Sequence, residues 1–192
     1  EVYGMSMVPR FDGTYAEYAV LPEASVCPKP ASLSFTEAAG VPLAALTAWG
    51  MVVDVARAHE GQRMLIHAGA GGVGHFAVQL AAYFGAHVTT TGSARNQGSL
   101  SVLRPGGLLV NAPSGSWPTM REDALGAGVR ATGYKVSPSG ATLAVLSRLF
   151  ESGDLRVHLD HVLPLSEAAE AHRLLEEGHT RGKIVLEVSP DQ

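Results

Sequence analysis

The chain has little of what marks several classes of protein. Cys27 is its only cysteine, which excludes a disulfide framework and a cysteine-rich zinc site. Charged residues make up 17% of the 192 residues, the formal net charge is −4, and there is no basic run, so the sequence argues against a nucleic-acid partner. Gly, Pro and Thr interrupt the apolar stretches before any of them is long enough to cross a membrane. We therefore expect a cytoplasmic globular protein that acts without a membrane or a nucleic acid.

What the chain does have is a large apolar fraction, 46%, and one informative glycine motif at 69–74. The motif stands between an apolar run, 63–67, and a segment, 73–84, whose apolar residues recur at helical spacing. A strand, a glycine turn and an amphipathic helix in that order favour a dinucleotide site. There the first glycine permits a tight turn, the second lets backbone approach the pyrophosphate, and the third lets helix and strand pack. The helix amino end offers N–H groups to the phosphates. The alternative is a glycine-rich turn that binds nothing. We predict that the dinucleotide is bound by Gly69, Gly71, Gly72, Val73 and Gly74.

The following strand indicates which dinucleotide is bound. Residues 87–91 are rich in β-branched side chains, and the chain continues as Gly92-Ser93-Ala94-Arg95-Asn96 without a carboxylate. An NAD site usually places Asp or Glu here to accept from the ribose 2′-OH. Arg95 can instead pair bidentately with a 2′-phosphate, and Ser93 can donate to it. The sequence favours NADPH; the alternative is that Arg95 is a solvated loop cation.

Strand and helix patterns follow one another along the chain. Residues 1–30 look β-rich, with strands at 1–5 and in the alternating stretch 14–20. Ser34 and Glu37 form a capping box, and Pro42 precedes a second helical run through about residue 58. Further strands are predicted at 63–67, 87–91, 108–110, 129–136 and 183–188, and further helices at 73–84, 139–152 and 166–177. This order predicts an α/β fold with a doubly wound parallel sheet.

Five ordered motifs together resemble the medium-chain dehydrogenase/reductase superfamily, in its zinc-independent quinone oxidoreductase and enoyl reductase branch. They are Gly13-Thr14-Tyr15-Ala16-Glu17-Tyr18, Ala44-Ala45-Leu46-Thr47-Ala48-Trp49, the glycine motif, Leu103-Arg104-Pro105-Gly106-Gly107 and Gly182-Lys183-Ile184-Val185-Leu186. The resemblance implies a Rossmann cofactor domain with remnants of a GroES-like β domain, and an active site between them. On this basis residues 1–45 are part of the GroES-like domain, 46–155 form the Rossmann domain, and 156–192 return to the substrate domain.

The chain departs from the family pattern in ways that concern metal and completeness. Leu43 stands at the position that resembles a catalytic zinc cysteine, and the eight histidines have no ligand spacing, so no metal is predicted. Family members have a long portion before the strand at 1–5. Near residues 96–100 the family pattern would continue through a helix, a strand, a helix and a strand, and each βαβ unit takes ~30 residues or more. We expect a missing segment there, either omitted from the sequence or lost by genuine truncation.

The resemblance also points to residues near the reacting end of the cofactor. Thr47 would lie near the nicotinamide ribose or ring and donate there, or else cap or pack within its own helix. Strand carboxyl ends face the ligand crevice, so Ala112 and Pro113 are candidates for cofactor contacts. Tyr134 is a candidate catalytic residue, unless its ring only covers the core. Lys135 is a candidate for the cofactor phosphates, unless it is a solvated cation.

These residues predict an NADPH-dependent oxidoreductase that transfers hydride to a quinone, enone or enoyl thioester without zinc. The alternative is a truncated, catalytically incomplete paralogue that binds the cofactor and acts as a sensor or assembly partner. The partner we expect is a small-molecule substrate. A homodimer formed through the strand at 129–136 is also expected, although its Arg130, Thr132 and Lys135 would equally suit an unpaired edge.

Overall fold

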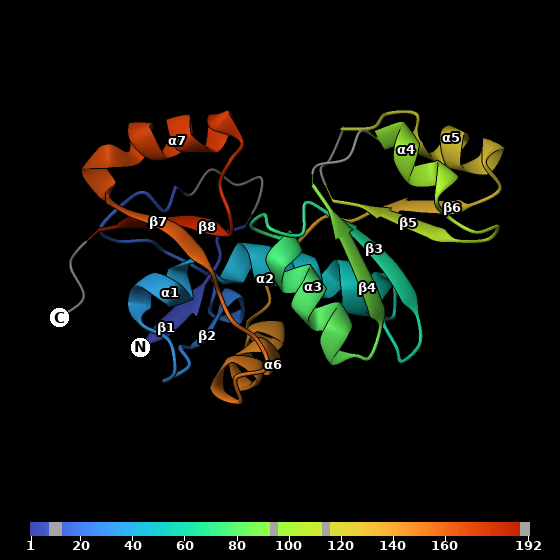
Figure 1. Ribbon diagram of the computed structural model, residues 1–192. Coiled ribbons are helices and arrows are strands. Elements are labelled where there is room, and N and C mark those ends of the chain that lie inside the picture. Colours follow the sequence, from blue (N-terminus) through green and yellow to red (C-terminus); the bar gives the residue numbers. More distant parts are fainter. Residues whose placement is uncertain (8–12, 93–95, 113–115, 189–192) are drawn as a thin grey trace.

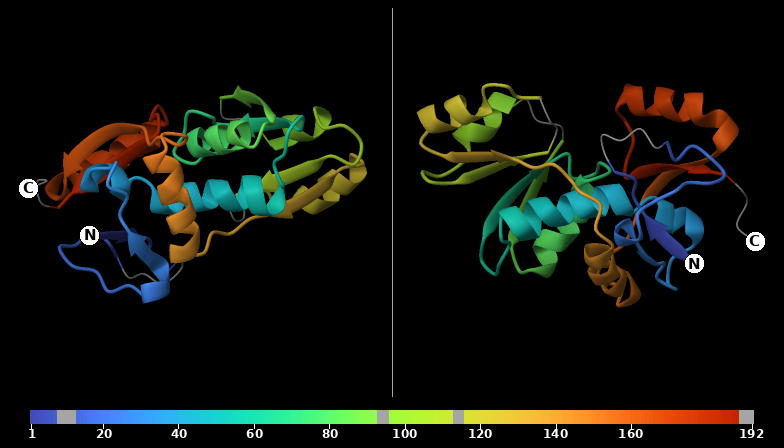
Figure 2. Two further views of the ribbon diagram at one scale, coloured as in Figure 1. Left: turned by 90° about the horizontal axis from the view of Figure 1, so that it is seen from below. Right: turned by 180° about the vertical axis from the view of Figure 1, so that it is seen from behind.

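The structure is a computed structural model that describes residues 1–7, 13–92, 96–112 and 116–188. It has two lobes side by side, with a helix running between them (Figure 1). One lobe holds β1 (Val2–Gly4), β2 (Val26–Pro28), α1 (Phe35–Ala39), β7 (Leu159–Pro164), α7 (Ala168–Glu177) and β8 (Lys183–Glu187). The other holds β3 (Arg63–His67), α3 (Gly74–Tyr83), β4 (His87–Thr91), α4 (Asn96–Ser101), β5 (Leu108–Asn111), α5 (Met120–Gly126) and β6 (Arg130–Gly133). Figure 2 shows α2 (Pro42–Trp49) spanning the junction, with α6 (Gly140–Glu151) against it.

The strands confirm the predicted α/β class. β3 pairs with β4, β5 with β6 and β7 with β8, all in parallel, whereas β1 and β2 are antiparallel. Over the described ranges each strand hydrogen-bonds to one neighbour, so β3–β4 and β5–β6 do not join into a single sheet. In the doubly wound order a further strand lies between these two pairs. A strand at this place in the sheet would belong to the segment that the sequence predicts to be missing near residues 96–100.

Local sequence signals explain where most helices begin. Ser34 accepts from the Glu37 N–H while the Glu37 carboxylate accepts from the Ser34 N–H, so the predicted capping box is confirmed. Proline opens α2 at its first position, and the Ser139 hydroxyl accepts from the Thr142 N–H at the start of α6. The predicted apolar faces of α3 and α6 are buried. Their buried apolar residues are Phe76, Ala77, Leu80, Ala81, Leu143, Leu146 and Phe150.

Two of the predictions for residues 1–60 are wrong. The alternating stretch 14–20 is not a strand: Tyr18 and Val20 are 90% and 91% exposed, and β1 pairs with β2 instead. Without a neighbouring strand, alternation alone cannot hold an extended segment in a sheet. The helical run after Pro42 ends earlier than predicted, and its last part, Gly50–Val55, is a π-helix. The strands β2 and β7 and the helices α4 and α5 are not predicted from the sequence.

No helix among the described segments is long and apolar enough to span a membrane.

Candidate functional site

The glycine loop joins the carboxyl end of β3 to the amino end of α3. The Gly71 N–H donates to the Ala68 carbonyl at 2.9 Å, and the His75 N–H donates to the Gly71 carbonyl at 3.0 Å. Ala68 has a φ of 51°, in the left-handed region that L-residues rarely adopt. The turn that the hydrogen bond from Gly71 to Ala68 closes has Gly69 and Ala70 at its centre, and Ala68, just before them, adopts the left-handed conformation.

The glycines of the loop serve different steric needs. A Cβ at Gly69 would lie 1.9 Å from the Thr90 Oγ1 on β4, and one at Gly74 would lie 1.9 Å from the Ala68 carbonyl oxygen. Both positions thus exclude a side chain because the protein itself packs there. A Cβ at Gly71 would meet only Ala68, at 3.2 Å from its oxygen and 3.9 Å from its Cβ. A Cβ at Gly71 is thus crowded only by the Ala68 carbonyl and far less than one at Gly69 or Gly74, which leaves this position the most open of the three to a ligand.

The loop also has the electrostatic character of an anion site. No side-chain hydrogen bond caps α3 at Val73, so the positive amino end of the helix is left to other partners. Lys183, the first residue of β8, lies beside the loop: a Cβ at Gly72 would be 3.1 Å from its Cδ and 3.4 Å from its Nζ. Burial lowers the pKa of the Lys183 amine, and no carboxylate among the described residues forms an ion pair with it. Figure 1 shows the start of β8 next to the amino end of α3.

Lys183 is not among the site residues predicted from the sequence. The residue was visible as the start of a predicted strand and as part of a family motif, but β8 lies in the other lobe. Only the tertiary contact, in which the Gly182 N–H donates to the Ala70 carbonyl at 2.7 Å, brings it to the loop.

A chain of hydrogen bonds closes the carboxyl ends of β3 and β4. The His67 Nδ1 lies 2.8 Å from the Thr91 Oγ1, which itself donates to the Gly92 carbonyl. His67 therefore donates through Nδ1 and accepts the Ser99 hydroxyl at Nε2, 3.0 Å away. Ser99 is buried, and no carboxylate of the described residues hydrogen-bonds to His67 or Ser99, so the arrangement fixes α4 to β3 rather than forming a nucleophile.

Two of the predicted residues make contacts within the fold. Thr47 is buried, and its hydroxyl donates to the Leu43 carbonyl at 2.7 Å within α2. Of the two roles that the sequence leaves open for Thr47, this hydrogen bond corresponds to the one within its own helix. The Tyr134 ring lies on Gly50, where a Cβ would be 1.9 Å from its Cζ and Oη. Burial, and to a lesser extent the charge of Asp54, raises the pKa of the Tyr134 hydroxyl.

The other predicted residues are less constrained. Ala112 is half-buried directly after β5, and Lys135 is exposed after β6. Ser93, Arg95 and Pro113 lie outside the described residues.

The residues that the structure describes do not fit a zinc site. They contain no group of three or more His, Cys, Asp or Glu side chains that could hold a metal ion. Leu43, at the position that resembles a zinc ligand, has no donor atom in its side chain.

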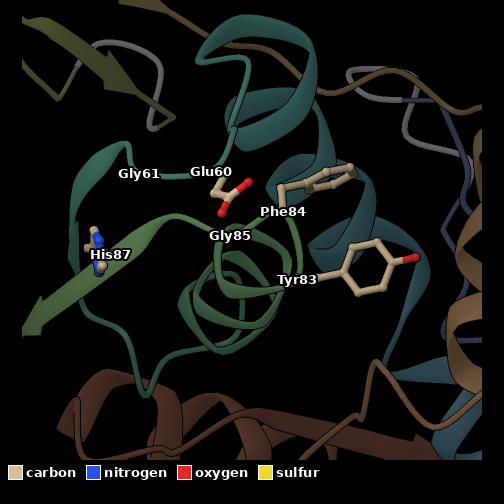
Figure 3. Close-up of a pocket in the computed structure, with 6 residues that line it drawn as sticks. All are labelled: Glu60, Gly61, Tyr83, Phe84, Gly85 and His87. Carbon is tan, nitrogen blue, oxygen red and sulfur yellow. The ribbon is translucent and has the colours of Figure 1, made fainter.

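A hollow of about 620 Å³ lies elsewhere, at the amino ends of β3 and β4. Figure 3 shows its lining, in which His87 and Tyr83 lie on opposite sides of Glu60. Ligands of doubly wound sheets bind at the carboxyl ends of the strands. This hollow is therefore not the dinucleotide site. It is lined by Glu60, Gly61, Tyr83, Phe84, Gly85 and His87.

Comparison with known proteins gives consistent matches. Residues 74–186 match the family model described as zinc-binding dehydrogenase. The mitochondrial NAD(P)H oxidoreductase RTN4IP1 of Danio rerio is 26% identical, with 96% of this chain and 65% of that protein aligned. The spectinabilin polyketide synthase system protein NorB of Streptomyces orinoci is 31% identical over 93% of this chain and 10% of its own length. The quinone oxidoreductase of Coxiella burnetii has a TM-score of 0.90 and 30% identity, covering 98% of this chain and 72% of that one.

The alignments also bear on the gap between the strand pairs. The match to the Danio rerio protein extends over 253 positions although this chain has only 192 residues. The relative thus has residues inside the aligned span that have no counterpart here. This agrees with a sheet in which a strand between β3 and β5 is absent from the described residues.

Proposed function

Because the chain belongs to the medium-chain dehydrogenase/reductase superfamily, in its quinone oxidoreductase and enoyl reductase branch, we propose that it is an NADPH-dependent oxidoreductase. It transfers hydride to a quinone, an enone or an enoyl thioester, without zinc. The observation that carries this proposal is the glycine loop, where a Cβ at Gly71 would meet only Ala68, and where Lys183 lies beside Gly72 and forms no ion pair with a carboxylate of the described residues.

In this proposal the loop and β8 hold the pyrophosphate. Backbone N–H groups at the amino end of α3 donate to the phosphates, and the Lys183 ammonium compensates their charge. A bound phosphate also stabilises the charged form of this partly desolvated amine. Ser93 and Arg95 contact the 2′-phosphate, while Ala112, Pro113 and Lys135 make the remaining cofactor contacts.

The nicotinamide supplies the hydride when the cofactor is bound. Thr47 has already donated its proton to Leu43, so its Oγ1 is suited to accept from a ribose hydroxyl rather than to donate. The name of the Coxiella burnetii relative, a quinone oxidoreductase, supports quinones as an acceptor class. Cytoplasmic localisation stays a prediction, since the Danio rerio relative is named as mitochondrial.

The preference for NADPH is tested by Arg95→Ala. Losing a charge-assisted contact to the 2′-phosphate should cost about 1.5–3 kcal/mol of NADPH binding, roughly 10- to 150-fold in Kd, and leave NADH binding nearly unchanged. Fluorescence titration with each cofactor measures both values. An equal effect on the two cofactors would show that Arg95 does not contact the phosphate.

The role of Lys183 is tested by Lys183→Met, with Arg181→Met as the matched control. Arg181 is an exposed cation two residues away whose N–H bonds Asp160. Loss of a charged phosphate contact should weaken NADPH and NADH alike, by roughly tenfold or more, without lowering the melting temperature. The Arg181 variant should bind as the wild type does. Unchanged affinity in Lys183→Met would remove this residue from the site.

One observation favours a second candidate function. The separate β3–β4 and β5–β6 pairs, together with the aligned residues that this chain lacks, fit a protein that binds the cofactor but does not complete the reaction. Such a protein would act as a redox sensor or assembly partner. NADPH oxidation with a simple quinone and with an enoyl thioester separates the two: binding without turnover supports the second function, and turnover excludes it.

A further inference from the structure

Helix α3 holds the segment between α6 and β7 along one side. The Arg156 N–H donates to the Gln79 Oε1 at 2.9 Å, and the Gln79 Nε2 donates to the Arg156 carbonyl at 3.0 Å. One turn earlier on the helix, the His75 Nε2 accepts from the His158 N–H at 3.4 Å. Residues four apart on a helix and two apart on an extended chain are spaced by similar distances, so both contacts form together. Figures 1 and 2 show this segment running past α3 on its way to β7.

The second ring nitrogen of His75 reaches the glycine loop. The His75 Nδ1 lies 3.0 Å from the Gly71 carbonyl oxygen. Because a backbone N–H can only donate, the Nε2 that faces His158 carries no proton, and the Nδ1 proton is donated to Gly71. The imidazole is therefore neutral and bridges the loop to the other lobe.

The backbone of β8 completes this connection. The Lys183 N–H donates to the His158 carbonyl at 2.9 Å, and the Gly182 N–H donates to the Ala70 carbonyl at 2.7 Å. The loop, β8, His158 and His75 thus form a closed ring of hydrogen bonds, in which His75 is the one side-chain link.

We infer that His75 is a positioning residue for the cofactor loop, and that its neutral imidazole fixes the Gly71 carbonyl so that the neighbouring N–H groups face the ligand. The inference rests on the proposed cofactor binding. A proton on Nε2 would face the His158 N–H, so protonation breaks the bridge. Burial lowers the pKa of His75, and the charges that face it from the segment before β7 and from β8, His158 and Lys183, lower it further.

The test compares wild type with His75→Gln over about pH 5 to 8, with NADP⁺ as the ligand. Glutamine can accept from the His158 N–H and donate to the Gly71 carbonyl, but it does not titrate. The ratio of the two affinities cancels the titration of the 2′-phosphate itself. We expect similar affinities at neutral pH and a roughly tenfold loss in the wild type alone on acidification. A constant ratio overturns the inference, and so does a wild-type affinity that rises, because the charge would then attract the phosphates directly.

Gln79→Leu is the matched control variant. It removes the adjacent contact with Arg156 but leaves His75 titratable, so its affinity should keep the pH dependence of the wild type. Loss of that dependence in Gln79→Leu would assign the effect to the packing of the segment and overturn the role of His75.

A ligand-free measurement keeps this inference distinct from the proposed function. ¹⁵N NMR of the imidazole should show the Nδ1–H form at neutral pH, and the His158 amide resonance should shift as His75 titrates. An Nε2–H form overturns the inference. If NADP⁺ binds to no variant while these signals are seen, the proposed function fails and the bridge stands.

Discussion

The cofactor lobe has two pairs of parallel strands, β3–β4 and β5–β6, which differ in the apolar core on which they pack. β3–β4 packs on α3, whose Phe76 and Leu80 are fully buried in the main apolar cluster with residues of α2 and α6. β5–β6 packs on α5, around the buried residues Met120, Ala124 and Val129. The main apolar cluster has no buried residue from β5, α5 or β6. The β3–β4 pair thus packs on the main apolar core of the protein, whereas the β5–β6 pair packs on a few buried residues outside that core.

This difference shows that strand pairing alone does not anchor a unit. Parallel strands are normally covered on both faces, and the doubly wound order supplies that cover through neighbouring strands and helices. Without a strand between β3 and β5 among the described residues, the β5–β6 unit depends on its ends for attachment. The Tyr134 ring, which lies on Gly50 directly after β6, is one such attachment. The glycine loop belongs to the anchored unit.

The largest expected effect is on cofactor binding, and two glycine variants in the loop after β3 distinguish a glycine needed for ligand approach from one needed for packing. Gly71→Val should abolish cofactor binding, because a side chain blocks the phosphates and at least two charge-assisted hydrogen bonds are lost, roughly 3–6 kcal/mol or more than 100-fold. Its melting temperature should fall only slightly, because its Cβ would lie 3.2 Å from the Ala68 oxygen. Gly74→Val should instead lower the melting temperature, because its Cβ would lie 1.9 Å from the Ala68 oxygen. Cofactor titration and thermal unfolding measure the two effects.

These glycine variants can also contradict the assignment. If Gly71→Val keeps its affinity, the phosphates do not approach position 71. If both variants lose stability to the same extent, glycine is needed at both positions for packing alone.

The difference between the two pairs should be visible in hydrogen exchange. We expect the amides of 108–112 and 116–133 to exchange about 30-fold faster than those of 63–67 and 74–91, which corresponds to an opening free energy lower by about 2 kcal/mol. The reason is that less apolar area holds the second unit to the rest of the protein. Exchange followed by mass spectrometry near neutral pH measures this. Equal protection in both units would mean that they unfold together.

The sequence predicted what local pattern decides. The bounds of β3 and β4 match the structure, as do the capping box of α1 and the apolar face of α6, because each depends on periodicity or capping within a short segment. The stretch 14–20 alternates just as regularly, yet it is not a strand, because pairing depends on a partner that is distant in sequence.

In the candidate site, too, the contiguous residues could be predicted from the sequence and the distant ones could not. The strand, loop and helix that surround the glycine motif were readable because they are contiguous in sequence. Lys183 and His158 reach the loop only through β8 and the segment before β7. The role of Ala68 was hidden as well, because a left-handed φ at a residue other than glycine is set by the surrounding structure.

The smallest expected effect concerns the attachment at Tyr134. Tyr134→Ala should cost about 1–2 kcal/mol of stability, since a half-buried ring is lost, and should speed exchange in 108–112 and 116–133 while leaving 74–91 unchanged. Tyr134→Phe keeps the ring and should change neither quantity. A purely packing role predicts that Tyr134→Phe also keeps the turnover of NADPH with a quinone. If Tyr134→Phe instead lowers turnover at unchanged exchange, the hydroxyl acts in catalysis, and the ring that attaches β6 also carries a reacting group.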